Sequence, residues 1–309
     1  MAETRALIET KALSVYYGRR RGIRKLGLSV DPGEVYGFLG PNGAGKTTTL
    51  RVLLDIIRPT SGSAAIFGLD CQKEGVRIRR RVGYIPGELS LHPHLRADEY
   101  FRMVDAVRGN RDGAARMRRL CERLNLDPHR AMHSYSRGNK QKIGLVAAFM
   151  GQPDLLILDE PTSGLDPLIQ QQVLELVREA RAGGRTVFFS SHVMSEVQAV
   201  CDRIGIIRDG ELVASERVEK LIRGRFHRLR LRFERMPPAG AFEGSGGREI
   251  GRTARDVTFD VRENLNLFLS RAVQYGVLDL EDHPFTLEEI FLEYYGKSGG
   301  DRHDQPAVA

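Results

Sequence analysis

Cysteine is scarce in this chain of 309 residues, which contains only Cys71, Cys121 and Cys201. The three thiols are odd in number and far apart, and none has the close spacing of a metal-binding pair. The sequence therefore predicts no disulfide framework, and this use of cysteine best fits a reducing cytosol.

Long apolar runs are also missing. The longest, from Ile143 to Met150, is well short of the roughly 20 residues that a membrane-spanning helix needs. The first residues, 1–5, lead into no apolar signal core. We therefore expect that the chain does not cross a membrane by itself, although it could dock on one.

The composition is that of an ordinary soluble globular protein, with 41% apolar and 28% charged residues. At about 150 residues per domain, the length predicts two domains. The net charge of +7 would suit a nucleic acid, an anionic membrane surface or a nucleotide. Because the charges are interspersed, a mildly basic surface without a specific partner is the favoured explanation.

Apolar patterns alternate between strands and helices along the first two thirds of the chain. Strands are predicted at 6–17, 26–31, 34–39, 155–158 and 186–190, helices at 48–58 and 168–182, and a mostly helical, arginine-rich region at 75–150. Asp209 and Gly210 predict a hairpin between strands 204–207 and 211–213. This alternation is typical of a largely parallel α/β sheet.

The composition changes after residue 224. Segments 228–233 and 257–261 alternate like half-buried strands, and 263–275 has a helical pattern. Thr286 and Glu289 form a capping box for a last helix that ends at Gly296. We therefore predict a first domain at 1–224, a small α/β domain at 225–296 and a disordered tail at 297–309.

A glycine-rich loop follows the strand at 34–39 and fits the phosphate-loop pattern G-x-x-x-x-G-K-[ST]. Its residues are Gly40, Pro41, Asn42, Gly43, Ala44, Gly45, Lys46 and Thr47, with Thr48 directly after them. Backbone N–H groups in such a turn point at one anion, and the helix N-terminus adds partial positive charge. Lys46 is expected to meet the β and γ phosphates, and Thr47 to give its hydroxyl oxygen to Mg²⁺.

Two carboxylates end the apolar strand at 155–158, where ligands of open α/β sheets collect. Asp159 is suited to hold Mg²⁺, directly or through water, and Glu160 to polarise an attacking water. His192 follows the strand at 186–190. A single histidine in that place is more often structural than functional.

Two further segments form distinctive motifs. They are residues 135–141 (Tyr-Ser-Arg-Gly-Asn-Lys-Gln) and 158–166 (Leu-Asp-Glu-Pro-Thr-Ser-Gly-Leu-Asp). Together with the phosphate loop, they resemble the ATP-binding subunits of ATP-binding-cassette (ABC) transporters over residues 5–225. The resemblance implies a P-loop NTPase cassette with a RecA-like core, an antiparallel β subdomain and a helical subdomain at about 85–150, followed by a small C-terminal α/β accessory domain. It also implies ATP hydrolysis, with ATP and Mg²⁺ as cofactors.

The resemblance assigns roles to further residues. Tyr17 matches an aromatic ring stacked on adenine. Ser136, Gly138 and Asn139 match a signature segment that caps the γ phosphate of ATP bound to a second subunit. Ser163 to Asp166 match the loop that crosses between subunits, His192 matches a histidine that contacts the γ phosphate, and Glu160 matches the catalytic carboxylate. Two such subunits are expected to pair head to tail around two ATPs.

Two departures from the family pattern stand out. Gly87 occupies the position of a glutamine that touches Mg²⁺ and relays motion to the membrane subunit. Our hypothesis is that Glu88 partly replaces it; the alternative is that the position is dispensable here. In the signature, Tyr135 replaces leucine, Asn139 replaces glutamine, and Arg137 replaces glycine, adding charge near a phosphate or pointing to solvent.

The ending at 285–296 is similar to bacterial ABC-2 type export ATPases. This predicts a peripheral protein on the cytoplasmic face of the cell membrane, with a polytopic permease and a second ATP-binding subunit as partners, no nucleic acid, and drugs, antibiotics or small lipids as cargo. The alternatives are a soluble ABC ATPase on the ribosome, a DNA-maintenance ATPase and an interaction module with a degraded site. The chain has a single motif set, whereas ribosomal ABC ATPases usually carry two cassettes. A DNA-maintenance ATPase would need a long coiled coil, and residues 48–135 show no sustained heptads. Intact Lys46 and Glu160 argue against a degraded site.

Overall fold

The computed structural model describes residues 6–18, 20–108, 113–223, 227–261, 264–284 and 289. Its contacts divide the chain into two compact units, residues 1–216 and 217–309, which are described separately. The composition predicts the boundary slightly later, after residue 224. The predicted helix at 286–296 and the predicted disordered tail at 297–309 lie outside the described residues, apart from Glu289.

A six-stranded sheet forms the centre of the first unit, in the order β10-β9-β3-β8-β7-β6. Its strands are β3 (Val35–Leu39), β6 (Val82–Ile85), β7 (Leu155–Asp159), β8 (Thr186–Ser191), β9 (Arg203–Arg208) and β10 (Glu211–Arg217). Strands β6 to β9 and β3 pair in parallel, which confirms the predicted largely parallel sheet. Every residue of β3, β7 and β8 is buried, as expected of a parallel sheet covered on both faces.

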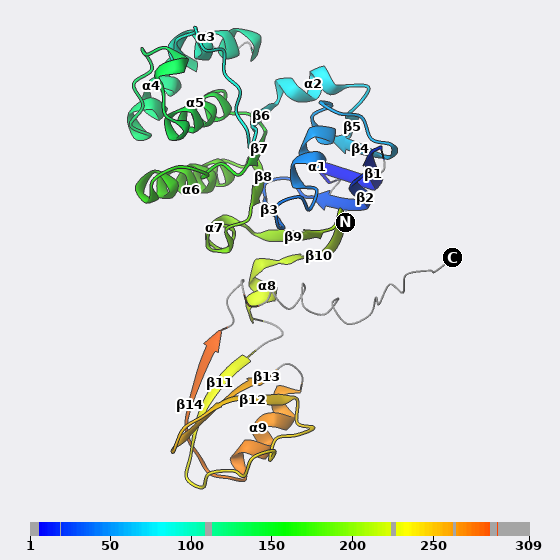
Figure 1. Cartoon of the computed structure of the whole chain (residues 1–309), viewed down its shortest axis with the longest axis vertical. Coiled ribbons are helices and arrows are strands. Elements are labelled where there is room, and N and C mark those ends of the chain that lie inside the picture. The colour runs from blue at the N-terminus through cyan, green and yellow to red at the C-terminus, as the bar shows by residue number, and fades with distance from the viewer. Residues whose placement is uncertain are drawn as a thin grey trace, which may run out of the picture. The chain divides into compact units, whose positions relative to one another are not determined.

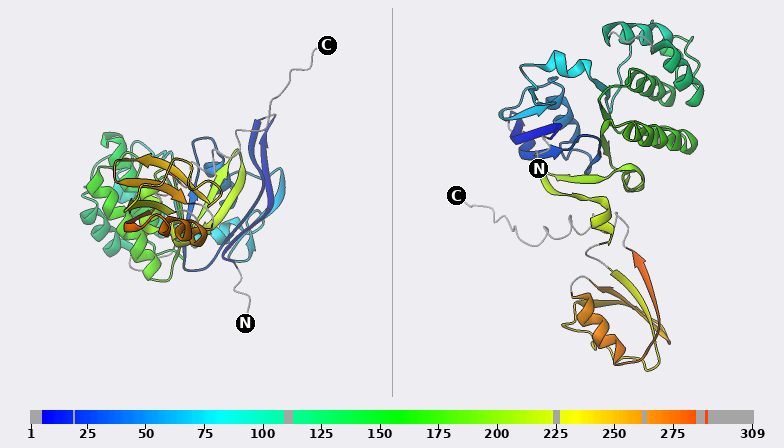
Figure 2. Two further views of the ribbon diagram at one scale, coloured as in Figure 1. Left: turned by 90° about the horizontal axis from the view of Figure 1, so that it is seen from below. Right: turned by 180° about the vertical axis from the view of Figure 1, so that it is seen from behind.

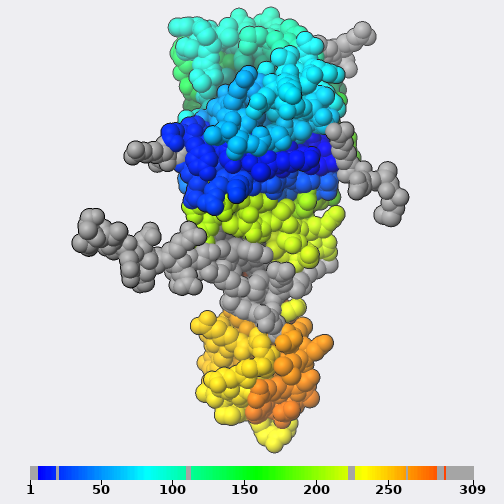
Figure 3. Space-filling view, turned by 90° about the vertical axis from the view of Figure 1, so that its right-hand side faces the viewer, coloured from blue at the N-terminus to red at the C-terminus, as the bar shows by residue number. Residues whose placement is uncertain are grey.

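A second, antiparallel sheet has the order β2-β1-β4-β5. Its strands are β1 (Ile8–Tyr17), β2 (Arg20–Val30), β4 (Ser61–Ile66) and β5 (Leu69–Asp70), and β1 and β2 (blue) lie at the surface in Figure 3. The predicted strand at 26–31 was too short, because β2 pairs with β1 as far as Tyr17 and Arg20. Strands β4 and β5 were not predicted from the sequence.

The helices of this unit lie around the central sheet (Figure 1). They are α1 (Lys46–Leu53), α2 (Gly75–Arg80), α3 (Ala97–Arg108), α4 (Gly113–Arg123), α5 (Arg137–Phe149), α6 (Pro167–Ala182) and α7 (Met194–Val200), with a short 3-10 turn at Met132–Ser134. Helices α3 to α6 group on the side of the sheet away from β1 and β2 (Figures 1 and 2). The predicted helix 48–58 was wrong at its end, because α1 already ends at Leu53. Asp55 follows with a left-handed φ of 54°, which does not continue a helix. The prediction also missed β6 and α7.

The second unit holds α8 (Val218–Arg223) and a four-stranded sheet of order β12-β13-β11-β14. The strands are β11 (His227–Phe233), β12 (Gly247–Arg252), β13 (Asp256–Val261) and β14 (Val277–Pro284), with helix α9 (Leu265–Val273). Phe242, Phe259 and Phe268 form the centre of its apolar core. The structure confirms the predicted strands β11 and β13 and the helix α9, whereas β12 and β14 were missed.

None of the helices in the described part of the chain combines the length and the apolarity needed to cross a membrane.

Candidate functional site: a phosphate loop facing two carboxylates

The phosphate loop joins buried strand β3 to helix α1. Gly43 and Gly45 have φ angles of 82° and 110°, which favour glycine because a Cβ atom is strained there. At Gly40 an added Cβ would lie 2.4 Å from the carbonyl oxygen of Ile207 on β9. The glycines therefore allow both the tight turn and its close contact with the neighbouring strand.

Lys46 begins α1 and is buried. Its Nζ donates to the carbonyl oxygens of Gly40 (2.6 Å) and Pro41 (3.3 Å), and lies 3.7 Å from Oε1 of Glu160. Burial lowers the pKa of Lys46, and the carboxylates of Glu160 and Asp159 oppose that shift. The loop thus concentrates a cation and backbone donors at one place, which is the requirement for binding phosphate.

Asp159 ends strand β7 with almost no exposure. The Thr47 hydroxyl donates to one carboxylate oxygen of Asp159 at 2.8 Å, and the Ser190 hydroxyl donates to the other at 2.5 Å. Carboxylate, hydroxyl and phosphate oxygens are the ligands that Mg²⁺ prefers. The oxygen atoms of Thr47 and Asp159 therefore fit a magnesium site beside the phosphate loop.

Glu160 follows with a left-handed φ of 49°. Its backbone N–H donates to the carbonyl of Ser190 at 3.1 Å, and the buried Gln141 amide donates to the carbonyls of Glu160 and Pro161. Nδ1 of His192 lies 3.2 Å from Oε1 of Glu160. The structure thus brings together the carboxylate and the histidine predicted to act on a nucleotide, on a turn held by its neighbours.

Hydrogen bonds of the buried Ser191 hold the turn that carries His192. Ser191 donates to the carboxylate of Glu196 at 2.9 Å and accepts from the backbone N–H of Val193 at 2.9 Å. Glu196 is buried in the first turn of α7. Neither Ser191 nor Glu196 was predicted as a site residue, because only their neighbour His192 belongs to the recognised pattern.

Tyr17, at the end of β1, is about half exposed and lines the same pocket as the phosphate loop, Thr48 and Glu160. Arg21 and Gly22 of β2 also line this pocket, although neither was predicted as a site residue. Their closeness to Tyr17 in the sequence could have indicated them, because β1 and β2 form a hairpin in which Tyr16 pairs with Arg21. The pocket offers an exposed ring beside a cationic, oxygen-binding loop, which suits a nucleotide.

The signature residues lie elsewhere. Ser136 caps α5 by accepting from the backbone N–H of Asn139 at 3.3 Å. An added Cβ at Gly138 would lie 2.8 Å from the carbonyl oxygen of Gly164, so the signature packs against the loop at 163–166. Asp166 caps α6 by accepting from the N–H of Ile169. Among the described residues, Ser136, Gly138 and Asn139 do not line the pocket around the phosphate loop.

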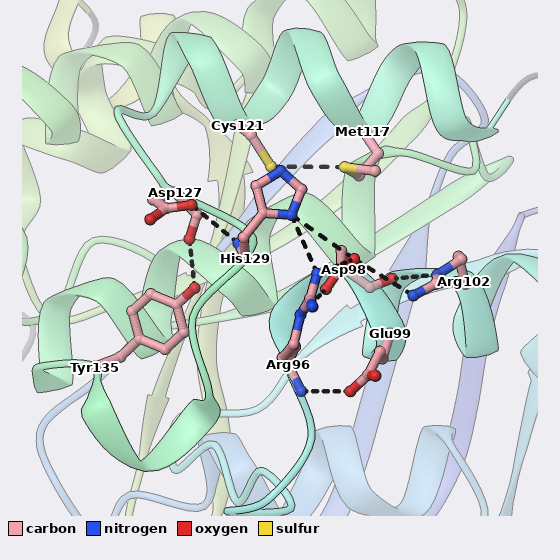
Figure 4. Close-up of polar contacts among 9 residues, drawn as sticks. All are labelled: Arg96, Asp98, Glu99, Arg102, Met117, Cys121, Asp127, His129 and Tyr135. Atoms are coloured by element: carbon pink, nitrogen blue, oxygen red, sulfur yellow. Dashed lines mark hydrogen bonds and ion pairs between the residues drawn. The ribbon is translucent and has the colours of Figure 1, made fainter.

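Tyr135, one of the departures in the signature, has a structural explanation. Its ring is buried, and its hydroxyl donates to the carbonyl of Asp127 (Figure 4). Figure 4 also shows Arg96, Arg102 and His129 around the carboxylate of Asp98. These contacts fix the segment that leads into the signature against the start of α3.

Gly87, the other departure, lies beside the carboxylate of Asp159. An added Cβ there would be 3.2 Å from Oδ2 of Asp159. Glu88 is exposed and lines a pocket with Gly87 and Arg137 at the start of α5. Whether Glu88 takes over the role of a glutamine stays a prediction.

Comparison with known proteins identifies the family. Residues 23–163 match the ABC transporter family. A linearmycin resistance ATP-binding protein of Bacillus subtilis is 35% identical over 67% of this chain and 68% of its own length. The chain belongs to the ABC transporter ATP-binding proteins. An ABC transporter ATP-binding protein of Nostoc is 39% identical over 63% of this chain but only 59% of its own length.

Other similar proteins agree with this family. A bacitracin transport ATP-binding protein of Bacillus licheniformis is 38% identical over 67% of this chain and 68% of its own length. A solved ATP-binding subunit of an ABC transporter aligns with a TM-score of 0.66 and 30% identity, over 70% of this chain and 91% of that one. The predicted fold, an ABC cassette, and the predicted enzyme class, an ABC ATPase, are thus confirmed.

Proposed function

We propose that this ABC ATPase binds ATP with Mg²⁺, hydrolyses it as one of a pair of subunits, and drives export through a separate polytopic membrane protein. The observation that carries the proposal is the chain of contacts that joins Thr47 to Asp159, Lys46 to Glu160, and Glu160 to His192. Each group has the chemistry that its role requires, and none is replaced by an inert side chain.

The roles follow from the contacts. Lys46 binds phosphate oxygens, and the Gly43 and Gly45 turn supplies N–H donors beside it. Glu160, 3.2 Å from His192, orients an attacking water and accepts its proton, while His192 contacts the terminal phosphate. Thr47 and Asp159 would hold Mg²⁺, whose charge would neutralise that developing on the phosphate oxygens.

A pair of subunits accounts for the signature. Ser136 and Gly138 sit beside the crossing loop at 163–166, outside the pocket that the phosphate loop lines. A second copy, or a related subunit, brings its own signature to that pocket. ATP then joins the two chains, and loss of the terminal phosphate separates them.

The cargo is an antibiotic, another drug or a small lipid. The support is the similarity to ATP-binding proteins named for linearmycin resistance and bacitracin transport. The permease would dock on the helical region that contains α3 to α5, which places this chain on the cytoplasmic face of the membrane. The small second unit would strengthen the pair of subunits.

The test is gentle purification of the tagged chain from native membranes, followed by identification of its partners. A stoichiometric polytopic protein is expected, together with drug efflux that is lost in Lys46→Ala. Recovery only from cytosol, ribosomes or DNA, or a clear rise in ATPase rate with nucleic acid, would contradict the exporter role and leave only the ATPase.

A further inference from the structure

Strand β8 places one serine directly beside the metal-facing carboxylate. In the parallel register of β7 and β8, Asp159 pairs with Ser190. Ser190 has no solvent exposure, and its hydroxyl donates to Oδ1 of Asp159 at 2.5 Å. The contact therefore lies beneath the site, among the residues of the central sheet.

The backbone of Ser190 holds the next residue as well. Its carbonyl accepts from the backbone N–H of Glu160 at 3.1 Å, where the chain turns with a φ of 49°. Left-handed backbone of this kind persists only where the surroundings hold it. Ser190 thus contacts both acidic residues of the site, one through its hydroxyl and one through its carbonyl.

The other donor to Asp159 cannot serve as a permanent anchor. Thr47 donates to Oδ2 at 2.8 Å, but its hydroxyl oxygen is also the atom suited to Mg²⁺. Among the described residues, Ser190 does not line the pocket around the phosphate loop. Its hydroxyl can therefore hold Asp159 both with and without a bound nucleotide.

We infer that Ser190 is a positioning residue that sets the orientation of the Asp159 carboxylate, and with it the affinity of the site for Mg²⁺. The inference rests on the proposed function, which makes Asp159 a magnesium ligand. A hydrogen bond to a buried charged group is a strong one, and its loss leaves a carboxylate oxygen without its donor. The carboxylate then rotates more freely and presents its ligand oxygen less often.

The experiment measures magnesium dependence without turnover. Binding of a fluorescent, non-hydrolysable ATP analogue to the full chain is titrated with Mg²⁺ for wild type, Ser190→Ala and Ser190→Cys. We expect the analogue to bind equally in EDTA, since the phosphate loop is intact. The Mg²⁺ concentration that gives half of the metal-dependent tightening should rise about 10-fold in both variants, as expected for a lost hydrogen bond to a charged group.

Two control variants isolate the role of the hydroxyl. Ser190→Thr keeps the donor and should restore a requirement for Mg²⁺ close to that of wild type. Thr186→Val removes another buried hydroxyl from the far end of β8, where it accepts from the N–H of Gly33 at 2.8 Å. This variant tests the general effect of deleting a polar group from the strand, and its Mg²⁺ requirement should not change.

The outcomes separate the inference from the proposed function. An unchanged Mg²⁺ requirement in Ser190→Ala and Ser190→Cys, or an equal rise in Thr186→Val, would overturn the role of Ser190. If Mg²⁺ did not tighten nucleotide binding even in wild type, the proposed metal site itself would fail. Thermal unfolding of each variant shows whether the fold is retained. If Ser190→Ala is unstable, the comparison uses Ser190→Cys, because cysteine is close in size to serine.

Discussion

Replacing Gly138 by alanine should separate nucleotide binding from hydrolysis. The new Cβ would lie 2.8 Å from the carbonyl oxygen of Gly164, whereas such carbon–oxygen contacts ordinarily lie at about 3.3–3.6 Å. The start of α5 and the crossing loop must therefore move apart by roughly half an ångström. Displacements of this order in catalytic positioning can reduce rates by about 10- to 100-fold.

The effect on stability should be small. Overpacking costs about 1–3 kcal/mol, but alanine in place of a helical glycine returns about 1 kcal/mol. The melting temperature should thus fall by only a few degrees, while the ATPase rate falls by at least about tenfold. Binding of ATP to the phosphate loop of a single chain, measured at a protein concentration too low for pairing, should be unchanged, because Gly138 does not line that pocket.

A second glycine of the same helix provides the control. An added Cβ at Gly144 would lie 3.0 Å from a methyl group of Leu89, a side chain that can rotate away. Gly144→Ala gains the same helix propensity without displacing backbone, so it should keep most of the ATPase rate. A wild-type rate in Gly138→Ala, or an equal loss in both variants, would refute the argument.

Three further predictions concern other parts of the chain. Glu88→Ala should weaken Mg²⁺-dependent ATPase and its coupling to transport; normal values for both would end the hypothesis that it replaces a glutamine. Arg123→Ala removes an arginine that binds two glutamates and a glutamine of α6, and should lower the thermal unfolding temperature by a few degrees; no change would show that the contacts do not stabilise α4. Two arginines of β11 lower the pKa of Asp256, so its contribution to stability is present at neutral pH and is lost as pH falls below about 4. Acid titration of unfolding should show a smaller loss in that range for Asp256→Asn, and an unchanged curve would contradict the ion pairs.

Much of the site was predictable because its residues occupy local patterns. The phosphate loop, the two carboxylates after an apolar strand, and the hairpin at Asp209 and Gly210 each fit within a few residues of sequence. Their chemistry depends on backbone conformation and residue type, both of which local sequence encodes. The resemblance to a known family then gave His192 and the signature residues their roles.

The missed features depend on contacts between distant segments. Ser190 lies beside Asp159 only because β8, late in the chain, inserts between β3 and β7. Sheet order of this kind is not visible in the pattern of a single strand. Likewise β4, β5, β12 and β14 are short or polar strands whose pairing, rather than their own apolar pattern, stabilises them.

The central claim, an ATPase that works as a pair, is tested most directly with Glu160→Gln. This variant keeps the phosphate loop and signature but removes the carboxylate that we propose accepts a proton from water. Light scattering coupled to size-exclusion chromatography should show a pair of chains in ATP and Mg²⁺, and single chains without nucleotide. Glu160→Gln combined with Lys46→Ala should stay single. ATP hydrolysis by Glu160→Gln at the wild-type rate, or a failure to pair in ATP, would contradict the account.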